Sequence, residues 1–347
     1  MKAIGYQQPS PISDPNALMD IELPQPVATG RNLLVKVYAI AVNPVDFKVR
    51  QSAAAEPGQH KVLGWDAVGE VVAMGDGVTL FQPGDRVYYA GDLTRPGSNA
   101  EYQLVDERLV GHKPSSLSDA EAAALPLTSI TAWELLFEHL QLARTEPNSG
   151  QNSDEVLLVV GAAGGVGSIL LQLAKVLTGA TIIATASREA SRHWVNQLGA
   201  DYVVDHKQPL KPQIDALIDQ HGLGPVTHVA SLNATEDYFD AYIDLLAPFG
   251  RIGIIDDPEA LDVMKLKSKS LSLHTEFMFA RSMHQARDMD AQHRLLDRVA
   301  QLIDQGHIRT TLGKQLGKIT AANLRAAHAE LESGRAVGKL VLEGFQP

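Results

Sequence analysis

The chain of 347 residues contains no cysteine. This absence excludes disulfide bonds, thiolate metal ligands and cysteine nucleophiles together. Long apolar stretches are also missing, because no uninterrupted apolar run approaches the length that crosses a bilayer. The first fifteen residues, MKAIGYQQPSPISDP, carry no apolar core of the length found in signal peptides. We therefore expect a cytoplasmic protein that does not insert into a membrane.

Basic side chains are in deficit as well, with 30 lysines and arginines against 41 acidic residues and a net charge of −11. This balance offers no electrostatic footprint for nucleic acid or for an anionic membrane. The 45% hydrophobic and 20% charged residues are ordinary for a globular protein, and the length suits two domains. We expect small molecules, and a second copy of the chain, as the partners.

The most informative stretch covers residues 156–188, VLLVVGAAGGVGSILLQLAKVLTGATIIATASR. The apolar run Val156–Val160 is typical of a buried parallel strand. A glycine-rich turn follows and opens a segment whose apolar residues recur at helical spacing, and Thr181–Thr185 predicts the next strand. This strand, turn, helix and strand form the context that a dinucleotide-binding fingerprint requires. The alternative is a glycine-softened helix start in another kind of α/β protein.

The glycines of this turn indicate how it would hold a pyrophosphate. Backbone without a Cβ at Gly164 and Gly165 lets phosphate oxygens approach, and the helix N-terminus offers free N–H groups and a positive dipole. Gly167 lets the helix pack against the strand. Ala162 stands where the fingerprint usually has its first glycine, which is a departure from the pattern.

The end of the second strand predicts which dinucleotide binds. An acidic residue about twenty residues past the glycines would bind the ribose hydroxyls of NAD. Ala186 stands at that place and is followed by Ser187 and Arg188. A hydroxyl and a guanidinium bind a 2′-phosphate, which a carboxylate would repel, so we predict NADP(H) as the cofactor. The alternative is that Ser187 and Arg188 only begin the next helix, as a cap and a solvated charge.

The regions on either side of residue 126 have different patterns. Before it, short β-rich segments alternate with turn clusters, which predicts a compact, barrel-like β domain; the segments are 33–42, 68–73, 86–90 and 100–105. Two loops, at 51–60 and 92–99, are candidates for the substrate pocket. Pro126 marks the change of domain.

After residue 126, α and β patterns alternate, which predicts an α/β fold with a doubly wound parallel sheet. Further strands are expected at 202–204, 226–230 and 251–255 and within 265–280, and helices around 214–218, 286–305 and 321–332. The closing run 339–342 is expected to form a strand that rejoins the first domain. A ligand should lie at the carboxyl ends of the parallel strands, near Gly161, Ser187, His206, Ser231 and Ile255.

Four phrases together carry a family resemblance: the glycine turn, YAIAVNPVDFKVR, LGWDAVGEVVAMGDGV with PGDRVYYAG, and the ending ELESGRAVGKLVL. With these phrases the chain resembles the medium-chain dehydrogenase/reductase superfamily. Within it, the chain is similar to the zinc-independent, quinone-oxidoreductase-like branch that includes zeta-crystallin, and to bacterial proteins often labelled zinc-type alcohol dehydrogenase-like. The resemblance implies a GroES-like substrate domain over 1–126 and 282–347 and a Rossmann NADP(H)-binding domain over 127–281.

The same resemblance implies a homodimer, because relatives commonly join sheet edges into one continuous sheet. The alternating run around 271–279 is the candidate edge.

Zinc alcohol dehydrogenases of this superfamily hold their catalytic metal with a cysteine in the phrase that reads YAIAVNPVDFKVR here, a histidine in a glycine-histidine-glutamate phrase and a third ligand near the interdomain helix. Asn43 and Trp65 stand at the first two of these positions here, and neither is a credible zinc ligand. The four-cysteine lobe for a second zinc cannot exist in this chain, and the twelve histidines show no compensating cluster. We therefore predict no metal site, and Trp65 fits an aromatic wall or plain core.

Without a Lewis acid that polarises a simple ketone, the easier substrate is one that accepts hydride at a conjugated carbon. We predict an NADPH-dependent reductase of quinones or α,β-unsaturated carbonyls. One alternative is a metal-free alcohol or aldehyde oxidoreductase, which would turn over saturated carbonyls. Another is a non-catalytic NADPH-binding protein with a structural or regulatory role.

The resemblance also implies the residues that contact the cofactor: Asn43, Thr131, Ala163, Gly164, Gly165, Val166, Ser187, Arg188, His206, Ser231, Asn233, Ile255 and Lys339. Asp46, Lys48 and Tyr89 are candidate catalytic residues, because each could donate or relay a proton to an enolate. Each has another interpretation, which we favour because water also protonates enolates. Asp46 would brace the turn after Pro44, Lys48 would be solvated or bind a phosphate, and Tyr89 would form a pocket wall.

Overall fold

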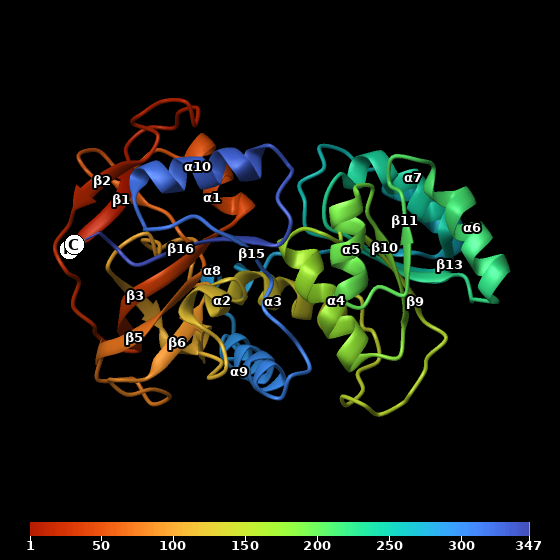
Figure 1. Ribbon diagram of the computed structural model, residues 1–347, viewed down its shortest axis with the longest axis horizontal. Coiled ribbons are helices and arrows are strands. Elements are labelled where there is room, and N and C mark those ends of the chain that lie inside the picture. Colours follow the sequence, from red (N-terminus) through yellow and green to blue (C-terminus); the bar gives the residue numbers. More distant parts are fainter. Residues whose placement is uncertain (347) are drawn as a thin grey trace. The chain divides into compact units, whose positions relative to one another are not determined.

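The computed structural model describes residues 1–346, which divide into two compact units (Figure 1). Unit one comprises residues 1–130 and the chain from Phe279 onward, and unit two comprises Thr131–Met278. The sequence placed these boundaries after 126 and 281. The first differs because Pro126 begins helix α3 (Pro126–Trp133) and does not mark a linker. Proline suits the first turn of a helix, where its missing N–H has no intrahelical acceptor.

Unit one is built on a mostly antiparallel sheet whose long central strand is β3 (Asn32–Val42). The sheet order is β15 (Leu312–Gln315), β16 (Lys339–Glu343), β3, β5 (Ala67–Met74), β6 (Arg86–Tyr89) and β8 (Val110–His112), and only β15 and β16 pair in parallel. Strand β7 (Tyr102–Asp106) also pairs with β3. A smaller sheet has the order β2 (Met19–Glu22), β1 (Lys2–Tyr6) and β4 (Lys61–Val62).

The last strand of the chain returns to the first unit, as the sequence predicted. Strand β16 pairs antiparallel with β3, from Leu340 opposite Val42 to Glu343 opposite Ala39. The pairing places Lys339, the first residue of β16, beside the carboxyl end of β3. The C-terminal segment therefore completes the sheet that residues 32–42 begin.

Short helices cover this sheet. They are α1 (Pro44–Ser52), α2 (Asp119–Ala123), α8 (Ala280–Met283), α9 (Ala291–Asp304) and α10 (Ala321–Glu332), with a 3₁₀ turn η1 (Glu107–Leu109). Helix α10 has the predicted bounds, and the side chain of Thr320 caps it by accepting from the backbone N–H of Asn323. Helix α9 starts five residues later than the predicted 286, because residues 284–290 form turns. It packs on β8, and the hydroxyl of Tyr88 on the adjacent strand β6 donates to the carbonyl of Leu296 at 2.5 Å.

Unit two is a doubly wound parallel sheet. Its strands, in sheet order, are β11 (Tyr202–Val204), β10 (Thr181–Thr185), β9 (Val156–Val160), β12 (Val226–Ser231), β13 (Leu246–Ile254) and β14 (Ser272–Thr275). The connecting helices include α4 (Gly165–Leu177), α5 (Glu189–Gln197), α6 (Leu210–His221) and α7 (Thr235–Leu245). Strand β9 is buried along its whole length, which explains its continuous apolar run. The strand order reverses between β9 and β12, and such a switch point is where ligands bind in open α/β sheets.

The predicted strand within 265–280 is shorter than expected. Its first residues belong to a 3₁₀ helix, η3 (Val263–Lys269), which ends where Ser270 takes a left-handed conformation with φ +51°. Only Ser272–Thr275 pair with β13, and Phe277 and Phe279 lie beyond the strand. Strand β14 is the outer strand of the sheet. The homodimer that would join sheets at this strand stays a prediction.

A π-helical turn, η2 (Glu134–His139), continues α3. Within residues 1–346, no helix combines the length and apolar character that spanning a membrane requires.

Candidate functional site

The turn after β9 is shaped by Gly161. This residue has φ +80°, a conformation that favours glycine, and a Cβ here would lie 2.5 Å from the Asn233 Oδ1 atom. Its N–H donates to the Thr185 hydroxyl at 3.3 Å. Gly161 therefore makes the tight turn that the fingerprint assigns to its first glycine, which explains why alanine is accommodated at 162. It also brings together the ends of β9, β10 and β12.

The next two glycines have separate roles. A Cβ at Gly167 would lie 2.6 Å from the Ala162 Cα atom, so close packing of α4 on the turn requires glycine there. A Cβ at Gly164 would meet only the Gly161 carbonyl oxygen, at an ordinary 3.4 Å, and its φ of −74° suits any residue. The fold therefore leaves room at Gly164 that a close-lying ligand would use.

This turn fits a pyrophosphate. Gly164 is the N-cap of α4 and provides no side chain to bind the first N–H groups of the helix. The residues predicted to hold the phosphates are all half-buried, which leaves part of each at the surface of unit two: Ala163, Gly164, Gly165 and Val166. The helix dipole and the free N–H donors make this end of α4 an anion site.

Positive charge gathers at the ends of β10 and β11. Ser187 is half-buried, and Arg188 is exposed and forms the N-cap of α5, with its N–H donating to the Ser191 hydroxyl at 3.2 Å. Burial lowers the pKa of His206; the carboxylate of Asp205 raises it, and the charges of Lys207 and Arg188 lower it. Arg188 and His206 therefore lie within electrostatic reach of one another. The arrangement suits a phosphate dianion, although Arg188 also begins a helix, as the alternative interpretation held.

Some residues at the ends of β12 and β13 hold the loops together by hydrogen bonds, and others lie at the surface. Ser231 is fully buried, and its hydroxyl lies 2.8 Å from the hydroxyls of both Thr235 and Tyr242. The carboxylate of Asp256 in turn accepts from the N–H and the hydroxyl of Thr235. The Ser231 side chain, predicted to line the cofactor, is thus committed to holding the loop.

Two further predicted residues lie at the same edge of the sheet. Asn233 is exposed beside Gly161, and Ile255 is half-buried with its N–H donating to the Ser231 carbonyl at 3.3 Å. Sequence reasoning missed Thr185, Thr235 and Asp256, although polar residues directly after buried strands are a detectable signal. Thr131, also predicted to contact the cofactor, is buried on α3 at the start of unit two.

Unit one contains a buried ion pair between Lys339 and Asp66. The Lys339 Nζ atom lies 2.9 Å from Asp66 Oδ2 and 3.1 Å from the Val42 carbonyl, and it also donates to Asn43 Oδ1. These bonds can use all three hydrogens of the ammonium. The structure thus gives Lys339 a structural role, where the sequence predicted that it would reach the cofactor.

Asn43 and Leu127 complete the surroundings of Asp66. The Asn43 Nδ2 atom donates to Asp66 Oδ2 at 2.8 Å and to the Trp65 carbonyl at 3.3 Å. The other carboxylate oxygen accepts the N–H of Leu127 at 2.8 Å, in the first turn of α3. The carboxylate is buried completely and is surrounded by donors from separate elements. The side-chain amide of Asn43 is therefore engaged on both its nitrogen and its oxygen.

The structure does not bring the three candidate proton donors together. Asp46 is buried and accepts a hydrogen bond from the N–H of Asn43 at 2.7 Å. Burial raises the pKa of Asp46 to about 7, although hydrogen bonds from the backbone N–H groups of Asn43 and Gly64 lower it. Lys48 lies exposed on the same helix. Tyr89 is fully buried, its hydroxyl has no hydrogen-bond partner in residues 1–346, and burial raises its pKa. Asp46 thus braces the turn at Pro44, which is the alternative that we favoured.

Comparison with known proteins decides the family. A Staphylococcus aureus protein named zinc-type alcohol dehydrogenase-like is 39% identical over 343 residues, which cover 99% of each chain. The chain belongs to the medium-chain dehydrogenase/reductase superfamily, in its quinone-oxidoreductase-like branch. Members of this superfamily are nicotinamide-dependent oxidoreductases. Two family descriptions match this chain: the alcohol dehydrogenase GroES-like domain matches residues 30–115, and the zinc-binding dehydrogenase family matches residues 198–342.

Solved structures of the superfamily agree with this assignment. A Rhizobium etli protein described as a candidate zinc-dependent alcohol dehydrogenase is 52% identical, with a TM-score of 0.94 over 100% of this chain and 99% of that one. Two mycobacterial structures, one complexed with NADPH and one called a quinone oxidoreductase, are 26% and 27% identical, with TM-scores of 0.80 and 0.79. Each comparison covers 99% of this chain; it covers 100% of the NADPH-complexed chain and 99% of the quinone oxidoreductase chain.

One relative has a name that states its substrate. A 2-methylene-furan-3-one reductase of Solanum lycopersicum is 39% identical over 206 residues, which make up 55% of this chain and 50% of that protein.

The residues of this chain do not fit the zinc that the superfamily's names imply. Trp65 is buried, its indole N–H donates to the Asp92 carbonyl at 3.2 Å, and its ring meets Phe279 edge to face. The Lys339 ammonium contacts the oxygens of Asn43 and Asp66 that a cation would need. No group of three or more metal-ligating side chains is found in residues 1–346. We therefore derive no chemistry from zinc.

The first prediction separates the two glycine roles. Gly167→Ala should lower the free energy of unfolding by about 1–3 kcal/mol, because its methyl group overlaps Ala162. Gly164→Ala should change that free energy by less than about 1 kcal/mol, since its methyl group meets no protein atom closely. It should nevertheless weaken NADPH binding, because the methyl group stands in the cradle. Urea unfolding and a fluorescence titration with NADPH measure the two effects; equal stability losses, or unchanged binding in Gly164→Ala, would contradict the assignment.

The second prediction concerns the buried ion pair. Lys339→Met should destabilise unit one by about 3–5 kcal/mol, because it leaves the Asp66 carboxylate buried without its counter-charge. Lys314→Met on the neighbouring strand β15 is the matched control. Lys314 pairs with Glu330 at the surface, and its loss should cost less than about 1 kcal/mol. Urea unfolding measures both variants, and similar losses in the two would refute the structural role of Lys339.

Proposed function

We propose that the protein is an NADPH-dependent reductase of quinones or α,β-unsaturated carbonyls that works without zinc. The observation that carries the proposal is the Asn43–Asp66–Lys339 cluster, in which a lysine ammonium holds the oxygen atoms that a catalytic metal would need. The superfamily otherwise provides a nicotinamide site. A protein that has the nicotinamide site and lacks a catalytic metal is suited to substrates that need no Lewis acid.

The cofactor proposal rests on unit two. The turn at Gly161–Gly167 and the N-terminus of α4 would bind the pyrophosphate, and Ser187, Arg188 and His206 would bind the 2′-phosphate. Strand β10 ends without a carboxylate, since the buried Ala186 follows it. A mycobacterial structure with a similar fold is complexed with NADPH, which supports the choice.

The substrate proposal rests on hydride transfer that needs no metal. Bound NADPH supplies a hydride, and a conjugated carbon accepts it without a metal to polarise the carbonyl. The protein then needs to position the substrate and exclude water. The tomato relative is named as the reductase of a conjugated ketone, and a mycobacterial structure is called a quinone oxidoreductase; both support this class.

No side chain is required as the proton donor. Asp46 holds the N–H of Asn43, and Tyr89 lies in the core of unit one. We therefore propose that water protonates the reduced substrate, since an enolate or hydroquinone anion takes its proton readily from solvent.

The third prediction tests the reaction. Protein treated with a chelator should oxidise NADPH in the presence of a simple quinone and an enone, and should leave the saturated ketone that matches the enone unreacted. Turnover of the ketone, or activity lost on chelation and restored by zinc, would contradict the proposal. Binding of NADPH without turnover of any of the three compounds would favour a structural or regulatory protein.

The fourth prediction tests the 2′-phosphate site. Arg188→Ala should raise the KM for NADPH about tenfold or more and leave the KM for NADH unchanged, because it removes a charge-assisted hydrogen bond to the phosphate. Lys211→Ala is the control, since Lys211 is an exposed basic residue that pairs with Asp215 on α6. Equal KM changes for the two cofactors would show that Arg188 only begins α5.

A further inference from the structure

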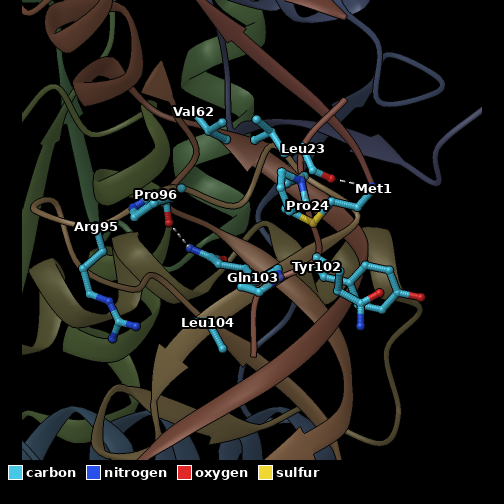
Figure 2. A pocket seen from close by; sticks show the side chains of 13 residues that line it. Met1, Leu23, Pro24, Val62, Arg95, Pro96, Tyr102, Gln103 and Leu104 are labelled. Atoms are coloured by element: carbon cyan, nitrogen blue, oxygen red, sulfur yellow. Dashed lines mark hydrogen bonds between the residues drawn. The ribbon is translucent and has the colours of Figure 1, made fainter. Parts of the chain in front are cut away.

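Unit one holds a cavity that shares no residue with the predicted cofactor and catalytic groups. Its volume is about 400 Å³, within the range of roughly 300–1,000 Å³ found for small-molecule pockets. The cavity lies among the start of β1, the segment after β2, Val62 of β4, and the segments 95–97 and 100–104 (Figure 2). It is therefore formed by the smaller sheet, the loop that follows β6 and the start of β7.

Most of the cavity wall is apolar. Met1, Leu23 and Pro24 form one side, and Val62 and Leu104 add further hydrocarbon (Figure 2). The N-terminal ammonium of Met1 donates a hydrogen bond to the Leu23 carbonyl at 2.7 Å. Such a wall favours a ligand with an apolar body.

Arg95 adds an uncompensated positive charge to this wall. The residue is half-buried, and its backbone N–H donates to the Asp92 carbonyl at 3.2 Å. In the described part of the chain its guanidinium makes no hydrogen bond or ion pair. The Asp106 carboxylate lies within electrostatic range, but both of its oxygens bind Arg108, at 2.9 and 2.8 Å. The charge of Arg95 is therefore available to an anion.

Gln103 contributes a second polar group to the cavity wall that contains Arg95. Its Nε2 atom donates to the carbonyl of Pro96, the residue after Arg95, at 3.1 Å. Its Oε1 atom is buried and accepts no hydrogen bond from residues 1–346. An unsatisfied buried acceptor costs free energy, which a ligand donor would recover. Figure 2 shows Gln103 between Arg95 and the apolar side chains of Met1 and Pro24.

We propose that this cavity binds a small apolar carboxylate that carries a hydrogen-bond donor next to its carboxyl group, such as a medium-chain 2-hydroxy acid. The carboxylate pairs with the Arg95 guanidinium, the hydroxyl donates to Gln103 Oε1 after a small rotation of that side chain, and the hydrocarbon fills the wall beside Leu23. The cavity contains none of the predicted cofactor or catalytic residues, but it shares Arg95, Pro96 and Gly97 with the 92–99 loop that the sequence favours for the substrate pocket, so competition with a quinone decides whether the two sites are distinct.

The fifth prediction uses three probes of equal chain length in calorimetric titrations of the whole protein saturated with NADPH. 2-Hydroxyoctanoate should bind, octanoate should bind several-fold more weakly because it lacks the donor, and 1,2-octanediol should bind about tenfold or more weakly because it lacks the charge. Arg95→Gln should weaken 2-hydroxyoctanoate about tenfold or more and abolish its advantage over the diol. Leu23→Trp, which fills the cavity from a surface segment, should abolish binding.

Lys314→Gln is the control, because Lys314 bears the same charge in unit one but pairs with Glu330 and does not line the cavity. Four outcomes would overturn the proposal: no binding to the folded wild-type protein, binding unchanged in Arg95→Gln, equal losses in Arg95→Gln and Lys314→Gln, or displacement of the probe by a quinone substrate. The last outcome would place the acid in the reductase site. Reductase activity measured on the same samples keeps failure of the proposed function separate from failure of this cavity site.

Discussion

The ion pair between Lys339 and Asp66 is the interaction on which unit one depends. It joins the start of β16, the segment before β5, the end of β3 through Asn43, and the first turn of α3 through Leu127. Removing two charges from water is costly, and a buried pair is stable only when further hydrogen bonds satisfy both groups. Both carboxylate oxygens and the ammonium meet this condition here. The pair therefore fixes one arrangement of these elements, because any other would leave a buried charge unsatisfied.

Unit two is organised by backbone geometry instead of charge. Gly161 turns the chain, Gly167 permits close packing of α4, and Gly164 leaves space in front of the helix N-terminus. The polar side chains behind this turn, Ser231 and Thr235, satisfy one another and leave the anion site to the N–H groups. The two units thus contribute different properties: unit two presents backbone N–H groups at a helix N-terminus, and unit one holds a closed polar cluster around Asp66.

Much of unit two could be predicted from sequence, because its signals are local. Strand β9 is a continuous apolar run since both faces of a central parallel strand are buried, and the glycine turn lies within a few residues of it. The limits of β14 could not be predicted in this way. The alternating pattern continues through Phe277 and Phe279, but pairing with β13 stops at Thr275. Hydrophobic alternation does not record where a neighbouring strand ends.

The cluster in unit one is the part that sequence reasoning interpreted differently, and the reason is distance along the chain. Asn43 and Lys339 were both selected, but as cofactor residues, because nothing local shows that a lysine near the C-terminus meets an aspartate near the N-terminus. Asp66 was not selected at all. Arg95 and Gln103 were missed for a related reason, since only the fold shows that the Arg95 guanidinium and the Gln103 Oε1 atom make no hydrogen bond within residues 1–346.

The closing strand β16 also has a consequence for synthesis. Lys339 and Asp66 are separated by 273 residues, so their bond cannot form until Lys339 has left the ribosome. Residues 131–278, in contrast, are contiguous and available earlier. During translation the sheet of unit one therefore stays incomplete, and the Asp66 carboxylate stays without its counter-charge, until β16 has been synthesised.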